Sequence, residues 1–246
     1  MSRSAVSAFV RKICLVVVLC LGQPGASHAY QGELPPPANL PTLTSEAGQQ
    51  RLLETAYRRA YWPLSAQFET QKSQAYCSVA SSVIVLNALG VDRPATSLYP
   101  DYPYFTQQDF FVRVDPRVAS PAGVEREGMT LEQLAQVLKG FGVDVATFPA
   151  AAMTLEQFRN LLQESLQQAS SFLLMNYDRR VIGEIGGGHW SPLAAYHPAS
   201  DSVLILDVAR YKYPPVWAPL KDLWAAGKSP DSVSGTSRGL LIVRRP

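Results

Sequence analysis

The chain has 246 residues, of which 47% are hydrophobic and 17% charged, and its formal net charge is +2. This balance excludes an intrinsically disordered protein, and 16 Gly with 19 Pro are too few for a low-complexity polymer. Arg3, Arg11 and Lys12 precede every acidic residue, so residues 30–246 carry 19 cations against 20 anions. No global basic field therefore points to nucleic acid as a partner.

Residues 1–29 have the pattern of a secretory signal peptide. A basic stretch is followed by the apolar residues 13–22, and residues 27–29 (SHA) form a small-x-small cleavage site. The apolar run is roughly half as long as a transmembrane helix requires, which favours cleavage over a permanent membrane anchor. Cys20 raises a lipoprotein anchor as the other alternative, against which the large Leu19 argues. We expect export to the bacterial periplasm and no membrane attachment after cleavage.

Cleavage after Ala29 would leave 217 residues, enough for one domain with a sizeable core. The mature chain would keep a single cysteine, Cys77, and two histidines, His189 and His197. One cysteine forms no internal disulfide, and a structural zinc site needs about four Cys or His ligands. An unpaired thiol is prone to oxidation in an oxidising compartment, so we expect Cys77 to have a function.

The first half of the mature chain predicts an extended arm over residues 30–50, rich in proline, and a short amphipathic helix over residues 49–59. Cys77–Leu89 is apolar nearly all round and precedes Gly90, the pattern of a buried helix with a glycine C-cap. Residues 92–128 hold five prolines among many aromatic residues, which predicts a long irregular segment with a function. The arm and this segment are the candidate surfaces for a homodimer.

The second half of the chain predicts two capped helices and several strands. Thr130 and Thr154 each precede Leu-Glu-Gln, a helix-start pattern, and we expect the first helix to end at Gly140 or Gly142 and the second near Gln168. Short apolar runs predict strands at Val143–Phe148, Phe172–Tyr177, Ser191–Tyr196 and Val203–Val208. Helices first and strands later indicate an α+β fold with a mainly antiparallel sheet.

Cys77 is the candidate nucleophile. It is the first residue of the predicted buried helix, where unpaired N–H groups and the helix dipole stabilise an anion and lower a thiol pKa from its usual value of about 8.5. We therefore expect a thiolate near neutral pH. The alternative is that Cys77 merely fills a small apolar site.

The base and its orienting carboxylate follow from a hairpin argument. His189 follows three glycines, which let backbone and ligand approach closely, whereas His197 has turn-like neighbours and is expected to be exposed. A turn near residues 198–199 places the residue opposite His189 near position 207, to within one or two residues, and Asp207 stands there. Cys77, His189 and Asp207 thus supply a nucleophile, a base and an orienter.

Gln71, six residues before the cysteine, is the candidate donor to a tetrahedral oxyanion, an interaction typically worth about 3 kcal/mol. Gln74 is the alternative donor, and a plain surface role is the alternative for both.

Several motifs resemble the catalytic domain of phytochelatin synthases. They are WPL at residues 62–64, FETQKSQAYCSVASSVIVLNALGV at 68–91, GMTLEQL, NYDRR at 176–180, and GGGHWSPLAAYHPASDSVLILDVARYKYPPVW at 186–217. The resemblance spans residues 38–243 and is greatest to the short bacterial members, in which the cysteine-rich C-terminal half of the plant enzymes is missing. It implies a papain-like cysteine proteinase fold, with the nucleophile helix packed on the sheet, and a single catalytic domain over residues 51–246.

The resemblance also implies the activity of a glutathione γ-glutamylcysteinyltransferase. In that family the triad, matched here by Cys77, His189 and Asp207, cleaves the bond between cysteine and glycine of glutathione and leaves a γ-glutamylcysteinyl thioester on the cysteine. A second glutathione then accepts the acyl group, which forms phytochelatin, or water releases γ-glutamylcysteine. Gln71 matches the family's oxyanion donor.

Glutathione carries two carboxylates, which arginine binds well. Arg179 and Arg238 are the candidate substrate ligands beside Gly188, and a solvated surface position is the alternative for both arginines. With the one cysteine used as nucleophile, we expect no dedicated metal site and no covalently bound cofactor; cadmium, zinc or copper would act as thiolate complexes of glutathione. This partner links the expected activity to the heavy-metal response.

Two other functions stay open: a papain-like peptidase of another specificity, such as a C39-type enzyme, and a non-catalytic thiol- or metal-binding module. Release of glycine from glutathione alone would distinguish the transferase from the peptidase. Unchanged behaviour of Cys77→Ala would favour the binding module.

Overall fold

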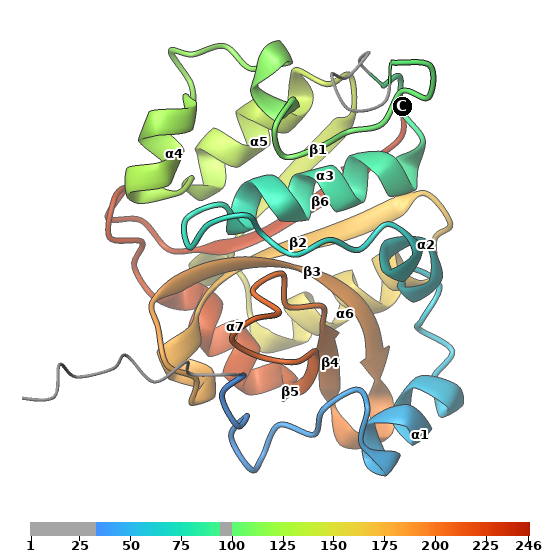
Figure 1. Cartoon of the computed structure of the whole chain (residues 1–246). Helices are drawn as coiled ribbons and strands as arrows, with labels where there is room; N and C mark the ends of the chain where they lie inside the picture. Colours follow the sequence, from blue (N-terminus) through green and yellow to red (C-terminus); the bar gives the residue numbers. More distant parts are fainter. Residues whose placement is uncertain (1–32, 94–99) are drawn as a thin grey trace, which may run out of the picture. The chain divides into compact units, whose positions relative to one another are not determined.

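A computed structural model describes residues 33–93 and 100–246 of the chain. This part has an α+β fold, as the sequence predicts: an antiparallel sheet with helices on both of its faces (Figure 1). The strands lie in the order β1-β6-β2-β3-β4-β5, and each neighbouring pair is antiparallel. The signal peptide predicted for residues 1–29 lies outside the described residues.

All the predicted strands are present, with their ends shifted by a few residues. The strands are β1 (Asp144–Pro149), β2 (Ser171–Asp178), β3 (Gly188–His197), β4 (Ser202–Ile205), β5 (Val216–Pro219) and β6 (Gly239–Arg244). The α-helices are α1 (Glu46–Glu54), α2 (Tyr61–Ala66), α3 (Cys77–Leu89), α4 (Pro121–Glu127), α5 (Leu131–Lys139), α6 (Leu155–Leu166) and α7 (Leu220–Lys228). Short 3-10 helices are η1 (Phe110–Arg113), η2 (Ala150–Ala152), η3 (Arg179–Ile182) and η4 (Pro198–Ser200). No helix among the described residues is both long and apolar enough to span a membrane.

Helix α3 is the buried helix that the sequence predicts, with the predicted bounds. It packs on β2 and β3 (Figure 1), and all of its residues except Ala88 are buried. A helix that is apolar all round loses water contact on every side, which explains this central position. Gly90 ends the helix with φ of 62°, a left-handed conformation that costs glycine little. Because α3 begins at Cys77, its packing fixes the position of this candidate nucleophile at the start of the helix.

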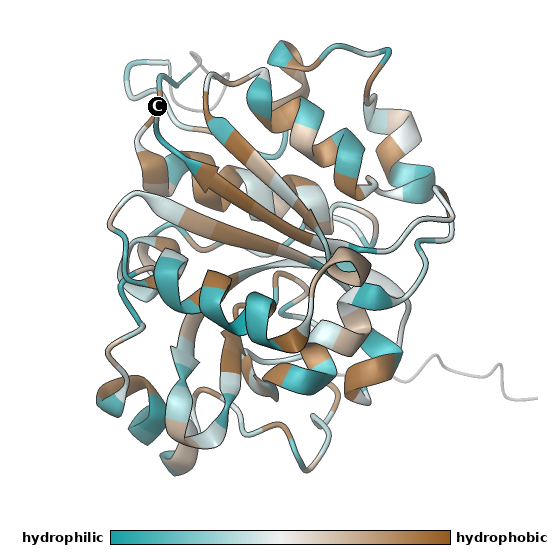
Figure 2. Cartoon of the chain, turned by 180° about the vertical axis from the view of Figure 1, so that it is seen from behind, coloured by the Kyte–Doolittle hydropathy of each residue, from teal (hydrophilic) through white to brown (hydrophobic). Residues whose placement is uncertain are grey.

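The opposite face of the sheet is covered by α6 and α7, which contact β2 from behind (Figures 1 and 2). Figure 2 shows mostly brown, apolar strands, whereas the helices in front of them alternate between teal and brown residues. The core therefore lies on both faces of the sheet, and one-sided helices separate it from water.

Both predicted helix starts are confirmed as complete capping boxes. The side chain of Thr130 accepts a hydrogen bond from the backbone N–H of Gln133, and the side chain of Gln133 accepts one from the backbone N–H of Thr130. Thr154 and Gln157 repeat the arrangement at α6. These reciprocal bonds satisfy N–H groups that have no partner inside the helix.

The N-terminal arm is shorter than predicted. Helix α1 already begins at Glu46, because Ser45 caps it by accepting a hydrogen bond from the N–H of Gly48. A Cβ on Gly48 would lie 1.9 Å from the carbonyl oxygen of Thr42, so the close turn into α1 requires glycine. The helix predicted over residues 49–59 therefore starts earlier and ends earlier, at Glu54.

Several elements were absent from the prediction. Within the segment predicted as irregular, Pro121 opens α4 behind the Ser120 cap, a typical helix start that the high proline content obscured. Helices α2 and α7 and strands β5 and β6 were also unassigned, although β6 lies near the centre of the sheet between β1 and β2. Its apolar run, Gly239–Arg244, has no polar alternation because both of its faces are covered.

Candidate active site

The structure places Asp207 beside His189, as the hairpin argument predicts. His189 is the second residue of β3, and its Nε2 lies 2.9 Å from Oδ1 of Asp207. Asp207 lies two residues beyond the end of β4, after a register shift of the β3–β4 pair between Leu193 and Ala195. This irregularity is why simple hairpin counting carried an uncertainty of one or two residues.

Oδ1 of Asp207 accepts hydrogen bonds from three groups. In addition to His189, Nη2 of Arg179 and the backbone N–H of Ala209 each donate to it at 2.8 Å. Burial alone would raise the pKa of this carboxyl, but His189 and Arg179 outweigh burial and hold the pKa well below its usual value. Asp207 is therefore ionised. Since a carboxylate only accepts hydrogen bonds, Nε2 of His189 carries the proton and Nδ1 is left as the base.

His189 is neutral in this site. Burial, reinforced by the positive charge of Arg179, lowers its pKa to about 4, although Asp207 acts in the opposite direction. The ring is fixed from the side by Tyr177, its register partner on β2, with the two ring centroids 5.7 Å apart in an edge-on arrangement. A neutral, oriented imidazole is ready to accept a proton at neutral pH.

The predicted low thiol pKa of Cys77 is wrong for this structure. Burial raises the pKa of the Cys77 thiol, and hydrogen bonding to backbone groups of Trp190 and Ser78 together with the charge of Arg179 opposes this rise only in part. The cysteine is 6% exposed, so desolvation of the thiolate outweighs the helix terminus. Burial thus favours the thiol over the thiolate at Cys77 and the neutral imidazole at His189.

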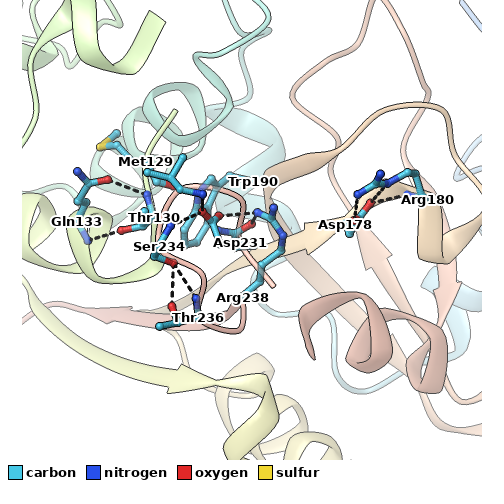
Figure 3. Close-up of polar contacts among 12 residues, drawn as sticks. Met129, Thr130, Gln133, Asp178, Arg180, Trp190, Asp231, Ser234, Thr236 and Arg238 are labelled. Carbon is cyan, nitrogen blue, oxygen red and sulfur yellow. Dashed lines mark hydrogen bonds and ion pairs between the residues drawn. The ribbon is translucent and has the colours of Figure 1, made fainter. Parts of the chain in front are cut away.

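Cys77 and His189 line the same pocket. It is also lined by Gly188, Asn176, Asp231 and Arg238. Nη1 of Arg238 donates to Oδ1 of Asn176 and to Oδ2 of Asp231, each at 2.8 Å; Figure 3 shows the contact between Arg238 and Asp231 next to Trp190 and Met129. The structure therefore places Arg238 and Gly188 in the same pocket as Cys77 and His189, the candidate nucleophile and base.

Gly188 makes this pocket wall possible. A Cβ at this position would lie 2.3 Å from Nη1 of Arg238, so the guanidinium can occupy its place only because residue 188 is a glycine. By contrast, a Cβ at the neighbouring Gly187 would meet nothing within 4 Å.

Arg179 is not placed as the sequence analysis expected. It was a candidate ligand for a substrate carboxylate, but it is 3% exposed and does not line the pocket. Nη1 of its guanidinium lies 2.6 Å from Oδ2 of Asp207 and also pairs with Oε2 of Glu184. The two carboxylates compensate the cost of burying the positive charge of Arg179. The geometry therefore indicates that Arg179 positions Asp207.

Gln71 is buried and does not line the pocket that contains Cys77, whereas the alternative donor Gln74 is exposed. The Nε2 group of Gln71 donates to the carbonyl oxygen of Ser73 at 2.7 Å and to the hydroxyl of Tyr211 at 2.9 Å. Both amide hydrogens are therefore engaged in this state of the protein.

His197 is buried rather than exposed as predicted. It is the last residue of β3, its Nδ1 lies 2.8 Å from Oγ of Ser200, and its Nε2 lies 3.5 Å from Oε2 of Glu54. It stands outside the pocket that contains Cys77. Among the described residues, no group of three or more His, Cys, Asp or Glu side chains is placed to hold a metal ion.

Four residues at or near the site were not identified from the sequence: Asn176, Glu184, Tyr211 and Asp231. Asn176 belongs to the NYDRR motif and Tyr211 to the motif at residues 186–217, so both could have been found there. No sequence motif indicates a role for Glu184 or Asp231, because the importance of each comes from its ion pair with an arginine in the folded protein.

Comparison with known proteins decides the family. The family model described as phytochelatin synthase matches residues 29–240. The chain belongs to the phytochelatin synthase family. Glutathione gamma-glutamylcysteinyltransferase 1 of Arabidopsis thaliana is 31% identical over 223 residues, which cover 88% of this chain and 44% of the relative.

Other phytochelatin synthase relatives agree. The Triticum aestivum protein of the same name is 32% identical over 219 residues, covering 88% of this chain and 42% of the relative. The glutathione gamma-glutamylcysteinyltransferase of Schizosaccharomyces pombe is 27% identical over 193 residues, covering 78% of this chain and 45% of the relative. The chain thus spans less than half the length of these curated relatives.

Proposed function

We propose that this protein is a glutathione γ-glutamylcysteinyltransferase that forms a γ-glutamylcysteinyl thioester on Cys77. The observation that carries the proposal is the pairing of His189 with the ionised Asp207 at a pocket that Cys77 lines. The names of the family's relatives support glutathione as the substrate.

We propose further that the fold is papain-like. The nucleophile at the start of α3, the base on β3 and the carboxylate after β4 follow one another in the order Cys, His, Asp, which is the papain-like order. The packing of α3 on the antiparallel sheet supports this assignment.

The proposed first step is acylation. Sγ of Cys77 attacks the carbonyl carbon of the cysteinyl residue of glutathione while Nδ1 of His189 takes the thiol proton. The tetrahedral intermediate then collapses, the C–N bond to glycine breaks, and His189 returns the proton to the departing amine. Asp207 stabilises the imidazolium that exists between these events.

In the proposed second step an acceptor attacks the thioester. The amine of a second glutathione gives its proton to His189 and forms a peptide longer by one γ-Glu-Cys unit, or water gives γ-glutamylcysteine. The thiolate of Cys77 recovers its proton from the imidazolium in either case. The triad thus returns to its neutral resting state.

The developing oxyanion needs donors. The first N–H groups of α3 have no acceptor within the helix and lie at the nucleophile. Gln71 remains the proposed side-chain donor, provided that one of its bonds, to Ser73 or to Tyr211, is exchanged for a bond to the oxyanion.

The pocket suits the γ-glutamyl end of glutathione, which carries both an ammonium and a carboxylate. Asp231 offers a carboxylate for the ammonium, and Arg238 offers a guanidinium for the carboxylate. Nε of Arg238 is buried without a hydrogen-bond partner, so one donor of this guanidinium is unsatisfied in the structure. We propose that Arg238 and Gly188 bind the substrate, and that Arg179 does not.

We propose that heavy-metal ions take part as thiolate complexes of glutathione, because the nucleophile is the one cysteine among the described residues. Tight stoichiometric cadmium binding by Cys77→Ser in the absence of glutathione would contradict this. Export to the periplasm is a further proposal from the sequence, and N-terminal sequencing of the mature protein tests cleavage after Ala29.

The test of the proposed function is incubation with glutathione, with and without cadmium, followed by mass analysis. We expect free glycine together with γ-glutamylcysteine or the peptide extended by one γ-Glu-Cys unit, and no product from Cys77→Ala. Absence of glycine from the wild type would reject glutathione as substrate, and cleavage of an unrelated peptide instead would favour the peptidase.

A further inference from the structure

The segment in front of the nucleophile has no regular secondary structure, yet it is closely held. Residues 68–76 lead into α3 without forming a helix or a strand, while Gln71 within them is 4% exposed. A buried irregular backbone needs partners for its N–H and C=O groups. The partners found here come from two distant parts of the chain.

Gln107 supplies one set of partners. Its Oε1 accepts a hydrogen bond from the N–H of Lys72 at 3.0 Å, and its Nε2 donates to the carbonyl oxygen of Thr70 at 2.9 Å and to Oε2 of Glu69 at 3.0 Å. Pairing with the C=O of one residue and the N–H of the second residue after it is what a neighbouring β-strand does. The side-chain amide of Gln107 thus takes the place of a strand.

The other edge of the same segment is tied to the catalytic carboxylate. The N–H of Gln71, between the two residues that Gln107 binds, donates to the carbonyl oxygen of Val208 at 2.9 Å. Val208 directly follows Asp207 in the chain. Gln71 is therefore clamped between Gln107 on one edge and the residue beside the catalytic carboxylate on the other.

Gln107 is itself anchored to the nucleophile helix. Asn87, in the last turns of α3, donates from Nδ2 to the carbonyl oxygen of Phe105 at 2.9 Å and accepts at Oδ1 from the N–H of Phe105 at 3.1 Å. Phe105 is 1% exposed and Gln107 7% exposed. Hydrogen bonds from α3 therefore hold Phe105, and the backbone from Phe105 leads two residues on to Gln107, which binds the segment that carries Gln71.

We propose that Gln107 is a positioning residue, which holds the segment that carries Gln71 against Val208 so that the amide of Gln71 can serve the oxyanion. This inference rests on the proposed function and deepens it, because it gives the segment of residues 92–128 a role in catalysis. A glutamine suits the position because one side chain must both accept from Lys72 and donate to Thr70 and Glu69. A glutamate there would face the carbonyl oxygen of Thr70 and the carboxylate of Glu69 without a proton to donate.

The test compares Gln107→Ala and Gln107→Met with Gln108→Ala, a matched control at the exposed neighbouring glutamine. Gln107→Met keeps most of the side-chain volume, so it separates loss of the hydrogen bonds from loss of packing. We expect both Gln107 variants to lower kcat for glycine release by about tenfold, with KM changed less than about twofold, and Gln108→Ala to match the wild type. An unchanged kcat in a folded Gln107 variant would overturn the proposal.

A double-mutant cycle separates positioning from a general structural role. If Gln107 acts through Gln71, then adding Gln107→Ala to Gln71→Ala should change kcat by less than about twofold, because the group being positioned is already gone. The same tenfold loss in both backgrounds would overturn the proposal.

Hydrogen exchange supplies a readout that needs no substrate. Peptides that cover residues 69–76 should exchange faster in Gln107→Ala and Gln107→Met than in the wild type and in Gln108→Ala. If the wild type releases no glycine, the proposed function fails and the exchange result still decides whether Gln107 holds the segment. Exchange as slow in both Gln107 variants as in the wild type would reject the clamp.

Discussion

The guanidinium of Arg179 and the imidazole of His189 share one oxygen, Oδ1 of Asp207, at 2.8 Å and 2.9 Å. The arginine thus fixes the carboxylate that orients the base. Glu184 pairs with the same guanidinium, and no part of the Glu184 side chain is exposed. The candidate triad therefore continues into a buried chain of ion pairs instead of ending at the aspartate.

Arg179→Lys tests this relationship. A lysine keeps the positive charge but cannot form the forked contact with Asp207, so the carboxylate and the imidazole lose their fixed geometry. We expect kcat for glycine release to fall by about ten- to a hundredfold, with KM within about threefold of the wild-type value. A large rise in KM at unchanged kcat would instead return Arg179 to the substrate-binding role expected from the sequence.

The pH dependence of thiol alkylation tests the protonation state of the nucleophile. Because burial raises the pKa of Cys77, the thiolate fraction should be small at neutral pH and should rise about tenfold per pH unit towards the pKa. The rate of inactivation by iodoacetamide should therefore climb steadily between about pH 6 and pH 9. A rate that is already constant above about pH 6 would show a preformed thiolate–imidazolium pair, contrary to this structure.

Gly188→Ala tests the wall of the pocket. The added methyl group overlaps the guanidinium of Arg238, so this side chain must leave its place beside Asp231. We expect KM for glutathione to rise by about tenfold, as the loss of one charge-assisted contact predicts. Gly187→Ala is the matched control, since its Cβ meets no atom within 4 Å. Equal KM values for the two variants would exclude Arg238 as a substrate ligand.

The sequence was most informative where local patterns decide structure. The apolar run Cys77–Leu89 with Gly90 predicts α3 with its observed bounds, and Thr130 and Thr154 predict the starts of α5 and α6. These features depend on hydrophobicity and on capping within a few residues, so tertiary contacts change them little.

It was least informative where burial and distant partners decide chemistry. The helix start at Cys77 predicts a lowered thiol pKa, but only the fold shows how much solvent the sulfur loses. Likewise, the sequence suggests Arg179 as a substrate ligand, and only the fold shows that its guanidinium pairs with Asp207 and Glu184. Hairpin counting could bring Asp207 near His189 but could not foresee the register shift in β3.

The most direct measurement is the mass of the protein shortly after it is mixed with glutathione and quenched in acid. A thioester intermediate predicts an adduct with the mass of one γ-glutamylcysteinyl group, located on Cys77 by peptide mapping and removed by hydroxylamine. Cys77→Ser should carry no such thioester, and it should release glycine far more slowly than the wild type. Glycine release by Cys77→Ser at the wild-type rate, or a wild-type adduct on another residue, would contradict acyl transfer through this cysteine.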